Sequence, residues 1–322
     1  MAARPELQLP EVVELSTLTI GDLDPLFYEE IQAWEERFYW DFRPSADLLR
    51  RFVQVHSLSG YALISQQSVV GYTYYVCEGR KGLIGDFFVR PEHASAASEM
   101  MLLGATVQGL MLVSGIRRVE SQLMMLRLPL TQALPFSQHL SRHDRNFMKI
   151  ERPAIQRLVP RSPELTVTFH AWTERFNEEI AHLVSAAYRG HVDSEINDQY
   201  RTIPGARHFL LNIIKYPGCG SFSPEASIVA VDARSGRVCG ACLASLVADN
   251  SGHVTQLCIL PAIRGARLGY ELLRQTLMRL VGAGCTIVSL TVTSSNRDAI
   301  RLYESVGFRT VSHFPALVWE GF

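Results

Sequence analysis

The chain has 322 residues, more than one ordinary domain needs and enough for two. Its 47% hydrophobic and 20% charged residues are typical of a globular protein and exclude a disordered chain. A formal net charge of -1 gives no long-range attraction for nucleic acid or an anionic membrane, so we expect neither partner. No secretory signal is evident at the start and no apolar run reaches the length of a membrane span. A cytoplasmic location is expected.

In chain order, the first elements form a unit of strand, strand, loop, helix and strand. Helical segments are predicted over about residues 22–56, and two apolar strands over 69–77 and 83–91. A loop and a helix that closes near Gly115 follow, and then a strand over 118–123. The early helical segment also holds an aromatic cluster, which we interpret as core, with an acceptor cleft as the alternative: Trp34, Phe38, Tyr39, Trp40 and Phe42.

The second part of the chain repeats this order. Prolines at 160 and 163 interrupt the periodicity, which predicts a boundary near residue 161 and two domains, 1–160 and 161–322. After a strand over 165–169 and helical segments over 173–215, a second hairpin, helix and strand follow over 238–292. A hairpin that feeds a helical crossover to a parallel strand implies a mixed sheet with helices on its faces, so the fold class is α/β.

Two of the six dispersed cysteines lie three residues apart in the second hairpin. Cys239 and Cys242 fall in a period-2 apolar stretch, and residues three apart on a regular strand point to opposite faces. We interpret both as reduced, buried thiols and expect no metal. A zinc or redox site is the alternative.

The segment from Pro261 to Tyr270 joins an apolar strand to an amphipathic helix. Free N–H groups and the positive end of the helix dipole attract phosphate at such a helix start, and glycines let a ligand approach the backbone. A solvated basic turn is the alternative interpretation. The predicted phosphate contacts come from Arg264, Gly265, Ala266, Arg267, Leu268, Gly269 and Tyr270.

Further along, Asn296 begins a helix that carries Tyr303 on its apolar face and ends at Gly307. The pattern Asn-x-x-Ala-x-x-x-Tyr-x-x-x-Gly-Phe after a strand resembles a hallmark of the GNAT superfamily of N-acetyltransferases. The earlier loop, with Arg264 first and Gly269 last, resembles that family's acetyl-CoA loop, although Arg267 stands where the family has a glycine. The resemblance implies two tandem GNAT-like acyl-CoA N-acyltransferase domains.

The resemblance also implies roles for individual residues. Asn296 would help to bind acetyl-CoA, and Tyr303 would protonate the departing CoA thiolate. His253 stands where many relatives carry a general base, with an ordinary surface histidine as the alternative. The backbone beside the pantetheine arm would be that of Leu257, Cys258 and Ile259. The implied reaction is direct attack of a primary amine on acetyl-CoA, without a metal.

The first copy lacks these signals. Its loop after Arg90 has no glycine and carries Glu92 and Glu99, whose carboxylates would repel pyrophosphate, so we expect a degenerate, non-catalytic domain. A non-catalytic acyl-CoA binding or sensing protein is the alternative function, and a structural protein that uses the fold is a third. No spacing encodes the acceptor or the oligomeric state. Polar residues placed to line an acceptor site are Tyr188, Asp193, Asn197, Tyr200 and Arg201.

Overall fold

The computed structural model of the protein describes residues 10–128, 133–216 and 218–322. They divide into two compact units. Unit 1 holds the chain through Arg37, then Phe42–His143 and Phe314–Phe322, and unit 2 holds Phe38–Asp41 and Asp144–His313.

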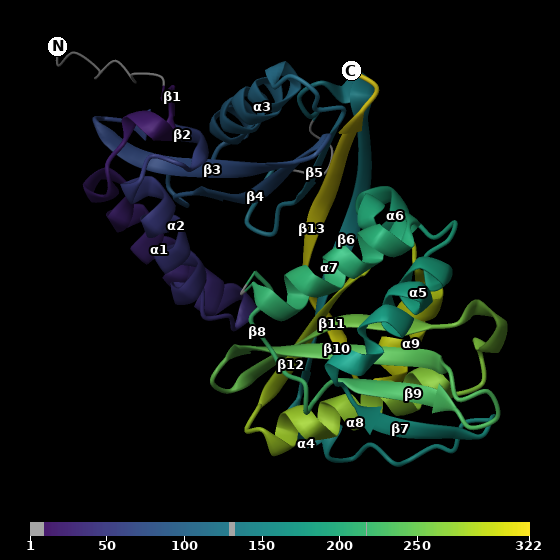
Figure 1. The fold of residues 1–322 in the computed structure, drawn as a ribbon. Coiled ribbons are helices and arrows are strands. Elements are labelled where there is room, and N and C mark those ends of the chain that lie inside the picture. The colour runs from purple at the N-terminus through teal and green to yellow at the C-terminus, as the bar shows by residue number, and fades with distance from the viewer. Residues whose placement is uncertain (1–9, 129–132, 217) are drawn as a thin grey trace, which may run out of the picture. The chain divides into compact units, whose positions relative to one another are not determined.

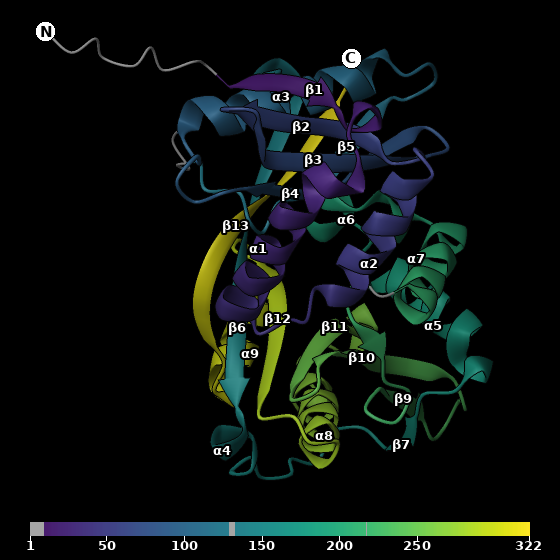
Figure 2. The same ribbon diagram turned by 90° about the vertical axis from the view of Figure 1, so that its left-hand side faces the viewer.

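Unit 1 is a mixed sheet in the order β1-β2-β3-β4-β5-β13, in which only β4 and β5 are paired in parallel. Helix α3 (Ala96–Leu112) covers one face, while α1 (Ile20–Phe38) and α2 (Arg43–Gln54) cover the other (Figures 1 and 2). Apolar side chains of α3 pack on the strands because this removes them from water. The strands are β1 Glu11–Glu14, β2 Ser59–Ser65, β3 Ser68–Glu78, β4 Lys81–Val89, β5 Arg118–Gln122 and, in its later part, β13 Arg309–Glu320.

Unit 2 holds strands of mixed direction in the order β6-β12-β11-β10-β9-β7, with β8 paired to β10. Only β11 and β12 are paired in parallel. Its strands are β6 Leu140–Glu151, β7 Val167–Ala171, β8 Ser221–Phe222, β9 Ile228–Asp232, β10 Val238–Ala248, β11 Ser251–Ile259 and β12 Ile287–Thr293. Its helices are α4 Arg152–Ile155, α5 Asn177–Ala187, α6 Asp193–Ile196, α7 Ile203–Lys215, α8 Leu268–Gly282 and α9 Arg297–Val306.

The helices of unit 2 cover both faces of its sheet (Figure 1). Helices α8 and α9 pack on one face, where Leu272 and Ile300 join Cys242 and Leu290 in one buried cluster. Helices α5 and α7 pack on the other face, in a cluster that includes Leu243. Single 3-10 turns connect these elements at Leu15–Thr17, Ser137–His139, Glu174–Phe176, Asp198–Arg201 and Pro261–Ile263. The predicted mixed α/β fold with a repeated unit is confirmed.

The compact units do not follow the predicted division at residue 161. Residues 145–151 of β6 pair with β12, so this part of the strand belongs to unit 2 although it precedes the proline-rich segment. At the other end of the chain, Ala316–Glu320 pair with β5 and belong to unit 1. Backbone hydrogen bonding across long sequence separations determines this division, and local composition does not report it.

The expected opposite orientation of Cys239 and Cys242 is wrong. A β-bulge between Val238 and Gly240 shifts the alternation of β10, and both thiols lie in the cluster beneath α8. Burial raises the pKa of Cys239 to about 11 and that of Cys242 to about 12, so both remain protonated thiols. Across the described ranges, no group of three or more His, Cys, Asp or Glu side chains could hold a metal ion. No helix among the described residues is long and apolar enough to cross a membrane.

Candidate functional site

Strands β11 and β12 of unit 2 separate partway along their length. Their parallel pairing joins Ser251–Val254 to Ile287–Leu290 and extends no further among the described residues. At the same point β11 has a bulge, because Val254 and Gln256 face consecutive residues of β10 and Thr255 is extra. The backbone of Leu257–Ile259 therefore pairs with β10 on one side only. Such an edge offers N–H and C=O groups to an extended ligand, as the sequence predicts for these residues.

Helix α8 begins beside this edge without a side-chain cap. Its N-cap residue, Arg267, has a φ of 60° and makes no side-chain capping hydrogen bond. Gly265 also has a positive φ, 88°, and a Cβ there would meet no atom within 4 Å. Arg267 thus adopts a conformation that favours glycine, the residue that the GNAT loop has at its place. The first N–H groups of α8 are oriented toward the loop, as phosphate binding requires.

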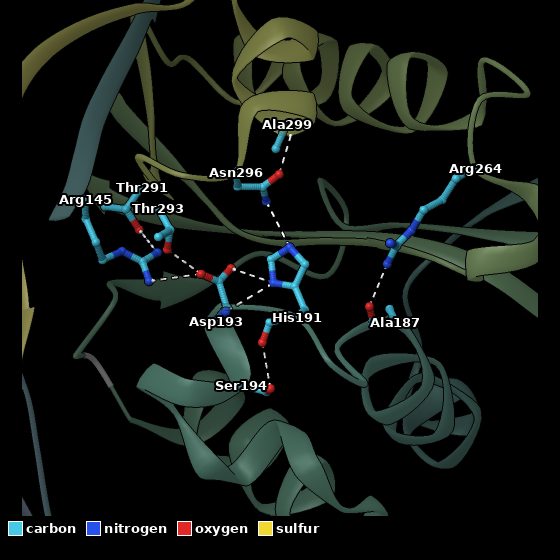
Figure 3. A network of polar contacts seen from close by, with 10 residues as sticks. All are labelled: Arg145, Ala187, His191, Asp193, Ser194, Arg264, Thr291, Thr293, Asn296 and Ala299. Atoms are coloured by element: carbon cyan, nitrogen blue, oxygen red, sulfur yellow. Dashed lines mark hydrogen bonds and ion pairs between the residues drawn. The ribbon is translucent and has the colours of Figure 1, made fainter. Parts of the chain in front are cut away.

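Several predicted loop residues hold the loop in place with their side chains. The Arg264 guanidinium donates to the carbonyl oxygen of Ala187 at 2.6 Å, which caps the C-terminus of α5 (Figure 3). The Tyr270 hydroxyl donates to the Val159 carbonyl at 2.9 Å, so only the backbone of Tyr270 is directed to the loop. Gly269 is closely packed, because a Cβ there would lie 3.0 Å from Ile259 Cδ1 and would require that side chain to shift.

The remaining loop positions contribute backbone. The Ala266 carbonyl accepts a hydrogen bond from the Glu164 N–H at 3.1 Å, and the Leu268 side chain is buried in the core. Arg264, Gly265 and Arg267 are exposed, so their surfaces are open to a ligand.

Asn296 is the N-cap of α9 and also contacts a histidine. Its Oδ1 accepts from the Ala299 N–H at 3.2 Å, and its Nδ2 lies 3.2 Å from His191 Nε2 (Figure 3). Its side chain therefore joins the start of α9 to the loop before α6.

Tyr303, about two turns further along α9 than the cap, is 8% exposed and lies in the cluster shared with Cys242. Burial, with the nearby Cys242 and Asp193, raises the pKa of its phenol above the ordinary value of 10.0. The hydroxyl is therefore a neutral hydrogen-bond donor throughout the range in which enzymes work.

His253 is buried among aromatic rings. It is 4% exposed, its ring lies 4.9 Å from that of Trp40, and its Nδ1 is 2.9 Å from Ser289 Oγ. Burial, assisted by the positive charge of Arg145, lowers its pKa to about 3. These surroundings argue against the predicted role as general base, because so weak a base takes a proton from an ammonium group at a large cost.

A polar network that the sequence analysis largely missed lies beside Asn296 (Figure 3). The Asp193 carboxylate accepts from Thr293 Oγ1 and lies 3.8 Å from Arg145 Nη1. The Asp193 N–H donates to His191 Nδ1 at 3.1 Å. Asp193 was among the acceptor-site candidates, but Arg145 and His191 were not. Arg145 lies on β6, a strand that no periodicity signal indicated.

Two further acceptor-site candidates gather at this network. The rings of Tyr188 and Tyr200 stack at 4.5 Å, and burial with the charge of Asp193 raises the pKa of both phenols. Asn197 and Arg201 instead stabilise local structure. Asn197 caps the turn after α6, and Arg201 Nε donates to the Ser194 carbonyl at 2.8 Å.

Unit 1 has the same strand separation but a different helix start. Residues Lys81–Ile84 of β4 pair with Arg118–Ser121 of β5, and the pairing extends no further among the described residues. Gly85 is the extra residue of a bulge in β4 that matches the bulge in β11. Helix α3, however, is closed by a capping box in which Ser95 Oγ accepts from the Ser98 N–H at 3.2 Å and Ser98 Oγ accepts from the Ser95 N–H at 3.1 Å. These side chains satisfy N–H groups that a phosphate would need.

The first turn of α3 also carries a buried carboxylate. Glu99 is 2% exposed and accepts from the Arg127 N–H at 3.0 Å, which ties the segment after β5 to the helix start. Burial raises the pKa of this group. Helix α8 carries a similar buried carboxylate in its first turn, Glu271, which accepts from the Arg161 N–H at 3.2 Å. The difference between the two helix starts is therefore the capping box, which closes α3 and which α8 lacks.

Comparison with known families identifies the second part of the chain. Residues 192–308 match the model of the acetyltransferase (GNAT) family. This segment is a GNAT acetyltransferase domain. The match covers the edge of β11, the α8 loop and the Asn296–Tyr303 helix. None of the curated proteins compared matches the sequence.

Solved structures extend the GNAT fold over the whole chain. A tandem GNAT protein of the clavulanic acid biosynthesis pathway, solved without acetyl-CoA, has a TM-score of 0.61 at 12% identity and covers 97% of this chain and 98% of its own. A GCN5-related N-acetyltransferase from Sphaerobacter thermophilus has a TM-score of 0.59 at 16% identity and covers 85% of each chain. A GCN5-related glucosamine N-acetyltransferase region of a fungal multi-domain GH3 β-N-acetylglucosaminidase has a TM-score of 0.59 at 13% identity, over 96% of this chain and 38% of that one.

These structural similarities establish a tandem GNAT fold. Because the sequence identities are 16% or lower, they establish the fold and not the function. The family match in addition indicates acyl transfer from an acyl-CoA by the GNAT domain. The fold expected from the sequence is thus confirmed, and the family match supports acyl transfer from an acyl-CoA, the coarser part of the expected activity.

Proposed function

We propose that the protein is an acetyl-CoA-dependent N-acetyltransferase, with one active site in unit 2, that transfers an acetyl group to a primary amine by direct attack. The observation that carries the proposal is the uncapped start of α8 beside the unpaired edge of β11, within the GNAT domain. Together they offer an anion site and a strand edge, the two features that a pyrophosphate and an extended amide-containing arm require.

In this proposal the chain binds acetyl-CoA mostly through backbone. The N–H groups from Gly265 to Tyr270 bind the pyrophosphate, and Arg267 adds an exposed positive charge. The edge from Leu257 to Ile259 pairs with the pantetheine arm. Asn296 fixes the start of α9. Its amide, which contacts His191 in the structure, forms a hydrogen bond to the cofactor instead when acetyl-CoA binds.

The chemical step is direct transfer between two bound substrates. The amine nitrogen attacks the thioester carbonyl carbon, a C–N bond forms, and the C–S bond breaks as the sulfur takes the electron pair. Tyr303 donates its hydroxyl hydrogen bond to this sulfur and supplies the proton as the thiolate leaves. The proton lost by the amine passes to water. His253 could accept it only at the cost described above, so we assign it no more than a secondary role.

The acetyl group and the amine are the finer parts of the proposal. They are supported by the descriptions of the three structural relatives, one of which is named as a glucosamine N-acetyltransferase. Unit 1 is assigned no acyl-CoA, because the capping box occupies the N–H groups at its helix start.

A panel of primary amines, assayed for CoA thiol release with acetyl-CoA, tests the function. We expect amine-dependent release by the wild type. Binding of acetyl-CoA without release by any amine, together with no effect of Tyr303→Phe on binding, would favour a non-catalytic sensor. No binding of acetyl-CoA at all would overturn the proposal.

A further inference from the structure

Arg145 is an incompletely paired cation in the polar network of unit 2. Its side chain is 11% exposed, its Nη2 donates to Thr291 Oγ1 at 3.2 Å, and its Nη1 lies 3.8 Å from Asp193 Oδ1 (Figure 3). Its Nε is buried and has no hydrogen-bond partner among the residues that the structure describes. A buried N–H without an acceptor is unfavourable, and a charged one more so. The arrangement therefore lacks an acceptor at the Nε edge of the guanidinium.

A second unpaired donor lies on the same face of the sheet. Gln256 is 5% exposed, and its buried Nε2 has no hydrogen-bond partner among the described residues. It is paired with Leu243, which lies on the face that α5 and α7 cover. Arg145 is paired with Thr293, whose hydroxyl reaches Asp193 of α6 on that face. The separation of β11 from β12 lies between the two donors.

The position of Arg145 is close to the proposed chemistry. Its charge lowers the pKa of His253 and opposes the rise in the pKa of Tyr303, so it acts on groups beside both strands of the gap. Asp193 is already held by Thr293 and lies beyond hydrogen-bond distance of the guanidinium. An additional anion at Nε would complete the donor set of Arg145 without displacing Asp193.

We propose that one of the two reactants carries a carboxylate and that Arg145 recognises it. The inference rests on the proposed function, and it names the substrate class of the same site. A guanidinium matches a carboxylate in geometry and charge, and the neutral amide of Gln256 adds a donor from the other side of the gap. The carboxylate has two possible sources: an amino acid acceptor, or the acyl chain of a dicarboxylic acyl-CoA.

The test compares acids with their amides. In the first comparison, thiol release is measured with acetyl-CoA and a set of amino acids, each paired with its amino acid amide. In the second comparison, acetyl-CoA and succinyl-CoA are the alternative donors to one amine that carries no carboxylate. We expect kcat/KM to be about tenfold or more higher for the carboxylate member of one comparison. A preference among acceptors assigns the carboxylate to the amine substrate, and a preference for succinyl-CoA assigns it to the acyl group.

Variants identify the residue responsible. Arg145→Gln is expected to remove the preference by lowering the carboxylate reaction to the level of its neutral counterpart. Arg301→Gln, the same change at an exposed arginine of α9, is the control and should leave the preference intact. Equal kcat/KM within all pairs, or an undiminished preference in a folded Arg145→Gln protein, would overturn the inference.

A binding measurement on the wild type tests the carboxylate site without requiring turnover or a folded variant. Calorimetry on the wild type in the presence of CoA compares N-acetylalanine with N-acetylalaninamide, and succinyl-CoA with acetyl-CoA. A Kd about tenfold lower for the acid of either pair supports a carboxylate site even if no amine is turned over, in which case only the proposed function fails. Equal affinities in both pairs together with no turnover preference would contradict the site.

Discussion

At the scale of single residues, sequence motifs predicted the places of Asn296 and Tyr303 on their helix better than the surroundings of His253 and Arg145. Asn296 caps α9 and Tyr303 lies on its buried face, because helix periodicity and capping are local properties that a sequence displays. Burial of His253 could not be predicted, since it depends on Trp40, more than two hundred positions earlier, and on Phe147 of β6. The same holds for Arg145, whose neighbours Thr291 and Asp193 come from other elements.

Tyr303→Phe should reduce kcat and leave the Kd for acetyl-CoA unchanged. The substitution keeps the ring that packs in the core and removes only the proposed donor to the sulfur. A general acid contributes about 10²–10⁴-fold, so a loss in this range is expected in single-turnover and steady-state thiol release. Full activity of a folded variant would show that water or another group supplies the proton.

His253 should make the protein less stable in acid. Its pKa is about 3 in the folded chain and about 6.5 when unfolded. Between these values the unfolded state binds a proton that the folded state does not, so stability present above about pH 6.5 is lost as the pH falls toward 3.

Denaturant unfolding at a series of pH values measures this effect. The free energy of unfolding should fall by up to about 1.4 kcal/mol per pH unit more in the wild type than in His253→Gln. Parallel curves for the two proteins would show that the ring is hydrated or protonated in the folded state.

At the scale of elements, the two helix starts that follow the two hairpins differ in structure, and we propose that this difference separates the roles of the units. The glycines near Arg267 and the carboxylates near Ser95 suggested that the two helix starts differ. They did not show that the difference lies in side-chain capping. In unit 1 the capping box closes α3, and in unit 2 Arg267 leaves α8 open. The bulge and the strand separation beside each helix are hydrogen-bond register effects, which residue types alone do not show.

Gly265→Glu should raise the Kd for acetyl-CoA by placing a carboxylate in the phosphate loop and a side chain at a φ of 88°. A matched control is Gly236→Glu, because Gly236 has a φ of 69°, has equally open surroundings and lies in the turn before β10. Both variants introduce the same charge change at a glycine with a positive φ in open surroundings. Calorimetry should show about tenfold or more weakening only for Gly265→Glu. Equal affinities in the two variants would place the pyrophosphate elsewhere.

At the scale of the whole molecule, the repeat was visible in the sequence and the division of the chain was not. Apolar hairpins with matching prolines predicted a repeated unit, and each compact unit contains one such hairpin, helix and strand. The compact units exchange segments, however, because β6 pairs with β12 and the last residues of β13 pair with β5. A cut at residue 161 would remove a strand from each unit, so the roles of the units are best tested in the intact chain.

The central claim is that one acetyl-CoA binds per chain, at the open helix start of unit 2. The most direct measurement is the stoichiometry of acetyl-CoA binding to the intact protein by isothermal titration calorimetry, for the wild type and for Gly265→Glu. The account predicts one site in the wild type and strong weakening of that single site in the variant. Two sites in the wild type, or one site that Gly265→Glu leaves unchanged, would contradict it.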